Sequence, residues 1–176
     1  MDLQLTDKRA LVTGSTAGIG FAIAEVLAGE GAAVIINGRT RESVAAATAK
    51  LTPAAKGEVT GFAGDLSTPE AAEAMARAHP DVDILINNLG IFEPKPFEDI
   101  PDADWRRFFE VNVLSGVRLC RLYLPAMRAR NWGRIIFISS ESGIQIPSEM
   151  IHYGMTKTAQ LAISRGLAET VAGTAI

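Results

Sequence analysis

Residues 13–20 read TGSTAGIG, between the apolar run RALV at residues 9–12 and a helical pattern that extends to residue 31. Gly14, Gly18 and Gly20 are spaced G-x-x-x-G-x-G, a variant of the G-x-G-x-x-G pattern of dinucleotide-binding turns. Gly14 permits a tight turn, Gly18 lets the backbone approach a pyrophosphate, and Gly20 lets the helix pack close to the sheet. Backbone amides at the positive end of the helix dipole complete an anion site. The segment predicts a phosphate-binding turn, and an ordinary glycine-rich turn is the alternative.

Short apolar segments alternate with longer helical patterns along the chain. Strands are predicted at residues 9–14, 32–38, 57–64, 82–88 and 133–140, and helices at residues 18–31, 41–51, 68–79, from near Asp104 to Arg130, and after Pro147. Strands that are apolar on both faces and separated by helices indicate an α/β fold with a doubly wound parallel sheet. Without a linker or repeat, residues 1–176 are predicted to form a single domain. We expect Pro125 to kink or divide the long helix and Ser148 to cap the last one.

The composition argues against several classes of function. Hydrophobic residues make up 48% and charged residues 21% of the chain, which is typical of a folded globular protein. A net charge of −3 without a basic block gives no sign of nucleic-acid binding, and no apolar run is long enough to span a membrane. Two histidines and one cysteine, Cys120, supply neither a metal-ligand cluster nor a disulfide. We expect a cytoplasmic protein, because the start of the chain lacks an apolar signal segment.

The end of the second predicted strand, INGRTRE at residues 36–42, bears on the choice of nucleotide. The usual dinucleotide site carries an acidic residue here, which bonds the ribose 2′-hydroxyl of NAD. Asn37 and Gly38 occupy that neighbourhood, and Arg39 follows with a guanidinium that can pair with a 2′-phosphate. NADP is therefore favoured as the cofactor, with NAD as the alternative. The other interpretation of Arg39 and Arg41 is a solvated loop and helix start.

Taken together, these motifs resemble the short-chain dehydrogenase/reductase family over nearly the whole chain. The T-G-x-x-x-G-x-G turn is residues 13–20, the family's Asp after the third strand is Asp65 in AGDLS, and N-N-A-G appears as NNLG at residues 87–90, with Leu89 in place of alanine. The resemblance implies a Rossmann fold. The cofactor-binding residues that it implies are Gly14, Ser15, Thr16, Gly18, Ile19, Gly20, Arg39, Asp65, Leu66, Asn88, Gly90, Tyr153 and Lys157.

The family's Y-x-x-x-K pair corresponds to Tyr153 and Lys157, which should lie one helical turn apart on one face. A neighbouring ammonium favours the ionised form of a phenol. We therefore predict that Tyr153 is the general acid in carbonyl reduction and the base in alcohol oxidation. The resemblance implies that Lys157 also holds the nicotinamide ribose, that Ser140 bonds the substrate oxygen and that Asn112 orders a water near Lys157. The predicted activity is NADP(H)-dependent interconversion of a small carbonyl compound and an alcohol.

Leu89 and the end of the chain are departures from the family pattern. A larger side chain at position 89 could narrow the nicotinamide pocket. Family members continue with a sixth strand, a substrate-covering segment and a seventh strand, whereas this sequence stops at Ile176. The strand near residues 134–139 is then expected to be an exposed edge. We expect that the intact protein has further residues, because all the catalytic positions are present. A non-catalytic dinucleotide-binding or interaction module is the alternative function.

Three further expectations concern the helices. The resemblance implies a homodimer or homotetramer that uses the long helix and the Tyr153 helix. His152 is expected at the surface or at the rim of a pocket, because adjacent helix residues face different ways. Gly154, which costs helix stability, is expected to allow close packing against the cofactor. The apolar residues that suit such an interface, or equally a core, are Val113, Val117, Leu161 and Ile163.

Overall fold

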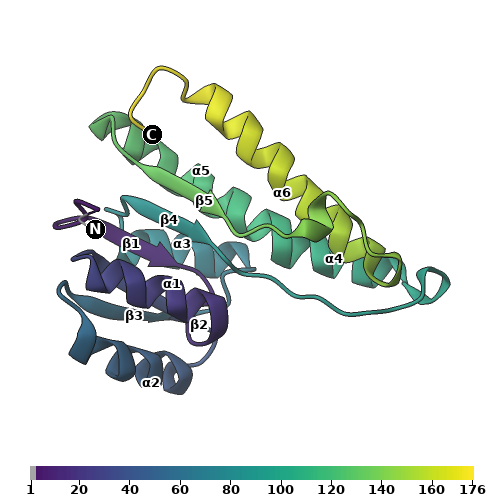
Figure 1. The fold of residues 1–176 in the computed structure, drawn as a ribbon, viewed down its shortest axis with the longest axis horizontal. Coiled ribbons are helices and arrows are strands. Elements are labelled where there is room, and N and C mark those ends of the chain that lie inside the picture. The colour runs from purple at the N-terminus through teal and green to yellow at the C-terminus, as the bar shows by residue number, and fades with distance from the viewer. Residues whose placement is uncertain (1–2) are drawn as a thin grey trace.

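A single parallel sheet lies at the centre of the computed structural model, which describes residues 3–176 (Figure 1). Its strand order is β3-β2-β1-β4-β5. The strands are β1 (Arg9–Val12), β2 (Ala33–Gly38), β3 (Val59–Ala63), β4 (Ile84–Asn87) and β5 (Arg134–Phe137). Val12 at the end of β1 pairs with Ile36 of β2 on one side and Ile86 of β4 on the other. The chain thus reverses its direction of winding at β1, which confirms the predicted doubly wound sheet.

The helices cover both faces of the sheet. They are α1 (Gly18–Gly29), α2 (Arg41–Leu51), α3 (Pro69–Ala78), α4 (Asp102–Phe109), α5 (Ser115–Arg130) and α6 (Ile151–Thr170). Short 3₁₀ turns occupy Thr52–Ala54, Phe97–Asp99, Glu141–Gly143 and Ser148–Met150. Thr40 and Thr68 begin α2 and α3, since each hydroxyl accepts a hydrogen bond from a backbone amide in the first turn of its helix.

Two apolar cores form because side chains alternate along each central strand. Ala10 and Val12 of β1 pack with α1 and α2, whereas Leu11 packs with α3 and α5 on the opposite face. All three are fully buried. The alternation repeats in β2 and β4, so the three central strands are buried on both faces of the sheet. The carboxyl ends of β1 and β4 are thereby fixed next to each other, which is where ligands bind in folds of this kind.

The long helical segment is divided at a place that the sequence did not indicate. Pro125 lies inside α5, which runs unbroken through it to Arg130, so the predicted division at Pro125 is wrong. A π-helical turn at Glu110–Leu114 separates α4 from α5 instead. The prediction for Ser148 is also wrong, since it starts a 3₁₀ turn and α6 begins only at Ile151. A π-helical turn adds one residue to the helical repeat, and helical periodicity alone does not reveal it.

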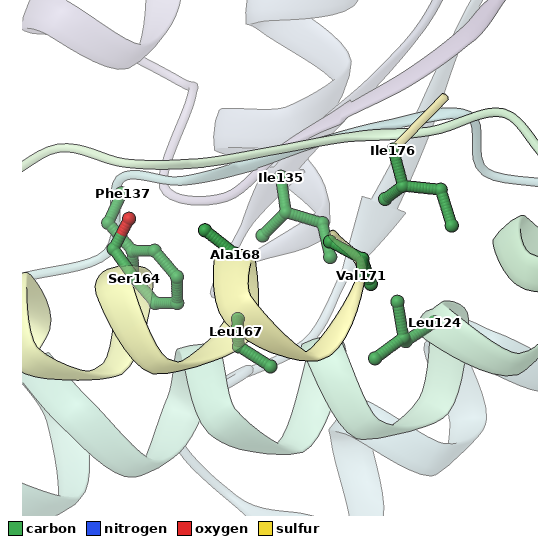
Figure 2. A pocket seen from close by; sticks show the side chains of 8 residues that line it. All are labelled: Leu124, Ile135, Phe137, Ser164, Leu167, Ala168, Val171 and Ile176. Carbon is green, nitrogen blue, oxygen red and sulfur yellow. The ribbon is translucent and has the colours of Figure 1, made fainter. Parts of the chain in front are cut away.

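β5 is an edge strand of the sheet, as expected, and α6 lies beside it. After α6 the chain turns back to the start of β5, where the carbonyl oxygen of Ala175 accepts hydrogen bonds from Gly133 N (3.4 Å) and Arg134 Nη1 (2.8 Å) (Figure 1). A small cavity of about 110 Å³ lies between α5, β5 and the end of α6. Its lining is apolar apart from Ser164 (Figure 2). Within residues 3–176, no helix combines the length and the apolar character needed to cross a membrane.

Candidate active site

The glycine turn after β1 is held in shape by the segment after β4. Asn88 Nδ2 donates to the carbonyl oxygens of Thr13 (2.9 Å) and Gly14 (3.2 Å), and Thr13 Oγ1 accepts from the amides of Asn88 and Leu89, both at 2.9 Å. A Cβ on Gly20 would lie 2.5 Å from Gly14 O. Gly20 is therefore required by the turn itself, whereas we had expected it to allow packing on the sheet. Asn88, predicted to bind the cofactor, stabilises the turn that would do so.

The start of α1 is open to an anion. Gly14 and Gly18 have positive φ angles, +59° and +56°, which favour glycine. Among residues 3–176, no heavy atom outside the adjacent backbone lies within 4 Å of the place where a Cβ on Gly18 would stand, and the first turn of α1 has neither a capping side chain nor an acidic residue. Ile19, also in this turn, is 66% exposed. The amides at this positive helix end are thus available to a phosphate group.

Ser15 lies beneath the turn rather than facing it. Its hydroxyl donates to Val12 O (2.6 Å) and accepts from Asn37 N (2.9 Å), while its own amide donates to Asn37 O (2.8 Å). The side chain is fully buried. Both polar groups of Ser15 are therefore used inside the protein, and we do not retain it as a cofactor ligand.

A cleft of about 290 Å³ extends from the glycine turn across the ends of the strands. It brings together six of the predicted cofactor-binding residues: Gly14, Thr16, Arg39, Asp65, Leu66 and Gly90. Leu89 also lines it, as its departure from the family pattern suggested. Leu66 is fully buried and belongs to the core behind this lining. One carboxylate oxygen of Asp65 accepts from the amide and hydroxyl of Ser67.

The contacts at the end of β2 favour an amide and a glycine over an acidic residue. Asn37 is buried, its Oδ1 accepts from Gly14 N (3.1 Å), and its Nδ2 donates to the carbonyl oxygens of Phe62 and Gly64. A Cβ on Gly38 would lie 2.4 Å from Thr16 Cγ2, so position 38 accepts no side chain without a shift. Arg39 is exposed at the cleft. The cleft thus carries a guanidinium where an NAD-selective site has a carboxylate.

Tyr153 and Lys157 lie together near the start of α6. Lys157 is 5% exposed, and its Nζ is 5.6 Å from the centre of the Tyr153 ring. Nζ donates to Ile138 O (2.8 Å) and to Gln160 Oε1 (3.1 Å). Burial lowers the pKa of the Lys157 ammonium below its usual value. An ammonium has three hydrogens, so one remains for the tyrosine or a ligand.

Asn112 connects this pair to the cleft. It lies in the π-helical turn, and its side chain accepts from Ile91 N (2.8 Å) and donates to Ile91 O (2.9 Å) and Thr156 Oγ1 (3.0 Å). A Cβ on Gly90 would stand 3.7 Å from both Asn112 Oδ1 and Lys157 Nζ. Gln160 Nε2 donates to Asn112 O (2.7 Å). Gln160 was not predicted as a site residue from the sequence, although its place three residues after Lys157 puts it on the same helix face.

Ser140 lies at the start of the loop that follows β5. Its Oγ accepts from Ser142 N (3.1 Å) and retains its own hydrogen for donation. The same loop is fastened to α6 because Ser139 Oγ donates to Lys157 O (3.2 Å) and Thr158 Oγ1 donates to Gly143 O (2.8 Å). These contacts place the serine loop against the helix that carries Tyr153.

Two expectations about neighbours of Tyr153 are wrong. His152 is fully buried, with its ring 4.0 Å from the Phe108 ring and 6.0 Å from the Trp105 ring, centre to centre. Gly154 packs against protein rather than cofactor, since a Cβ there would lie 2.6 Å from Ile146 Cγ2 and 3.0 Å from Ser142 O. Both residues determine how the first turn of α6 packs against α4 and the loop after β5.

Comparison with known proteins places these features in context. Residues 8–176 match the short chain dehydrogenase family. The uncharacterized oxidoreductase YvaG of Bacillus subtilis (strain 168) is 56% identical over 175 residues, which cover 99% of this chain and 66% of YvaG. The L-sorbose reductase of Gluconobacter frateurii, solved with NADPH and L-sorbose, is 34% identical with a TM-score of 0.91 over 97% of this chain and 66% of the reductase. A 3-oxoacyl (acyl-carrier-protein) reductase from Agrobacterium tumefaciens C58, solved with NADP, is 35% identical with a TM-score of 0.90 over 98% of this chain and 67% of that one.

Proposed function

The chain belongs to the short chain dehydrogenase family, and we propose that it is an NADP(H)-dependent oxidoreductase that interconverts a carbonyl compound and an alcohol. The observation that supports this proposal most is the position of Lys157, buried beside Tyr153 and next to Gly90 at the cleft. Burying an ammonium is costly unless it is paired or used, and here two neutral acceptors hold it beside a phenol. The stability of α6 does not require a buried lysine beside a tyrosine, so the pair favours a role in catalysis.

Residues of this chain would bind the cofactor, orient the substrate and transfer a proton. The uncapped amides at the start of α1 would hold the cofactor's pyrophosphate, and Gly90 would let its nicotinamide end approach Lys157. When bound, the nicotinamide supplies or accepts the hydride at the carbonyl carbon. Tyr153 Oη would donate a proton to the carbonyl oxygen during reduction and accept it back during oxidation. Ser140 Oγ would donate a hydrogen bond to the same oxygen as its charge develops.

Asn112 would act through its neighbours. The Asn112 side chain already makes hydrogen bonds to Ile91 and Thr156. These bonds favour a structural role for Asn112 over the ordering of a water molecule. Asn112 joins the segment after β4 to the helix that carries Lys157. We therefore propose Asn112 as a positioning residue for Gly90 and Lys157, and its backbone carbonyl as the acceptor that holds Gln160 in place.

NADP is proposed as the cofactor because Arg39 lines the cleft and no acidic residue stands at the end of β2. The two solved relatives described above were solved with NADPH or NADP. The Arg39→Ala substitution should weaken NADPH binding about tenfold to a hundredfold, the value of a hydrogen bond to a charged group, and leave NADH binding unchanged. Arg77→Ala, at an exposed arginine of α3, is the matched control. Equal losses for both nucleotides would show that Arg39 does not bind the 2′-phosphate.

The test of the activity is NADPH oxidation with a panel of aldehydes and ketones, alongside NADPH binding followed by fluorescence. The chain spans 66% of the length of YvaG, so a dinucleotide-binding module without turnover is the competing function. Saturable NADPH binding together with ketone-dependent oxidation supports the oxidoreductase. Binding with no oxidation of any carbonyl compound supports the module.

We also propose a homodimer or homotetramer built on α5 and α6, in the cytoplasm. An apolar groove of about 500 Å³ runs between these helices and includes Val117 and Ile163 from the predicted interface. Leu161 is 40% exposed on α6 but lies outside the groove, with its Cδ1 3.3 Å from the place where a Cβ on Gly143 would stand, and Val113 is buried in the core. Sedimentation of the purified protein would report its oligomeric state, and a monomer at micromolar concentration would end this part of the proposal.

A further inference from the structure

We propose that the carbonyl substrate is an apolar compound whose hydrocarbon group packs on Phe92 and Ile146 beside Tyr153. This inference rests on the proposed function and adds a substrate class to it. It depends on four observations. The exposed ring of Phe92 lies against Tyr153, and hydrogen bonds or ion pairs hold the residues on both sides of Phe92. Ile146 adds a second apolar side chain from another loop, and charged groups close to Phe92 are paired.

Phe92 lies against Tyr153 and yet remains in solvent. Its ring centre is 6.3 Å from that of Tyr153, at an interplanar angle of 64°, which is an edge-to-face contact. The residue is nevertheless 72% exposed. A substrate bound with its oxygen at Tyr153 Oη would therefore have the face of Phe92 available to its adjoining group.

The exposure of Phe92 does not come from a loose loop. The residue before it, Ile91, exchanges two hydrogen bonds with the buried Asn112 side chain. The residue after it, Glu93, pairs with Arg107 Nη2 at 2.7 Å and with Lys95 Nζ at 3.2 Å. Anchored on both sides, the backbone holds an apolar ring in water, an arrangement that is relieved when an apolar ligand covers it.

Ile146 brings a second apolar side chain to the same helix turn from the loop after β5. Its Cγ2 lies 2.6 Å from the place where a Cβ on Gly154 would stand, so it touches the residue next to Tyr153. It is 44% exposed. Two loops from different strands therefore supply exposed apolar surface at the first turn of α6, Phe92 against Tyr153 and Ile146 against Gly154.

The charges nearest to Phe92 on its own segment are paired with one another or with α4. Lys95 pairs with Asp104 as well as Glu93, and its amide donates to Glu149 O (2.8 Å). The Glu149 carboxylate accepts from Ser148 Oγ (3.3 Å). Glu93 and Lys95, the charged groups nearest to Phe92 along the chain, therefore already have partners of opposite charge. The group that remains without a partner beside Tyr153 is the apolar ring of Phe92, which favours an apolar substituent on the substrate.

The experiment compares the kcat/KM of the protein for 2-butanone, 2-hexanone and 2-octanone with NADPH, and for hydroxylated ketones of the same carbon number. We expect kcat/KM to rise up to about fourfold per methylene, the value for full burial of a CH₂ group. Phe92→Ala should flatten this rise, while the NADPH affinity stays unchanged. Phe97→Ala is the matched control, because Phe97 is also exposed on this segment but packs on Trp105, with ring centres 6.4 Å apart.

Binding gives a second readout that does not need turnover. Calorimetry of 2-octanone with the NADPH-loaded Tyr153→Phe variant should show saturable binding that Phe92→Ala weakens and Phe97→Ala leaves intact. A flat chain-length series, a preference for the hydroxylated ketones, or equal effects of the two Phe variants would each overturn the inference. Reduction of hydroxylated ketones alone would overturn it and keep the proposed function, whereas no reduction of any ketone would remove both.

Discussion

Gln160 is the residue on which the position of Lys157 depends, and replacing it gives a quantitative test. Its Oε1 accepts from Lys157 Nζ at 3.1 Å, its Nε2 donates to Asn112 O at 2.7 Å, and it is 1% exposed. Gln160→Met keeps the volume and removes both hydrogen bonds. Losing a bond to a charged group costs about 1.5–3 kcal/mol, and leaving a buried carbonyl unpaired costs about 1–3 kcal/mol. We therefore expect a loss of about 3 kcal/mol, which lowers the Tm by about 6–12 °C in a domain of this size.

The assay is urea unfolding followed by circular dichroism at pH 7.5, with the midpoint and slope fitted together. Gln145→Met, at an exposed glutamine on the loop after β5, is the control and should change stability by less than about 0.5 kcal/mol. If Gln160→Met were as stable as the Gln145 control, Gln160 would not be holding Lys157. The description of the buried ammonium would then have to be abandoned.

Two further predictions concern other buried groups. Burial lowers the pKa of His152 below its usual value of 6.5 in the folded protein, with Glu93 and Asp104 opposing this shift and Lys95 and Arg107 supporting it. The unfolded chain then binds more protons than the folded protein just below pH 6.5, so the free energy of unfolding should fall as the pH is lowered from 7 to 5. His152→Leu should make the unfolding midpoint less dependent on pH over this range. The same pH dependence in the variant and the original protein would contradict this prediction. Burial also raises the pKa of the Cys120 thiol to about 12. The native protein should therefore not react with a thiol reagent at pH 8, whereas the protein unfolded in urea should react with one equivalent. Rapid labelling of the native protein would contradict this prediction.

Features set by local sequence could be predicted, and the sheet is the main example. The alternation of short apolar runs and helical patterns gave the doubly wound arrangement, and TGSTAGIG placed the turn at the end of β1. The pairing of Tyr153 and Lys157 followed from helix geometry alone. Each of these depends on residues within one element or in two consecutive elements.

Features set by distant partners could not be predicted. Asn37 bonds Gly14 across 23 residues, and Gln160 bonds Asn112 across 48, so nothing next to either residue reveals its role. His152 is buried because α4 supplies Phe108 and Trp105 to cover it. Ser15 matched the cofactor pattern by position, yet its hydroxyl and amide serve the turn itself.

In the proposed mechanism, Tyr153 is the group that transfers the proton. The decisive measurement is single-turnover NADPH oxidation by Tyr153→Phe, with NADPH affinity measured on the same sample. Tyr123→Phe is the control, since Tyr123 is buried in α5 and its hydroxyl has no hydrogen-bond partner within residues 3–176. We predict that Tyr153→Phe binds NADPH normally and reduces the carbonyl substrate at least about a hundredfold more slowly, the lower range for loss of a general acid. A rate equal to that of the Tyr123→Phe control would contradict the account.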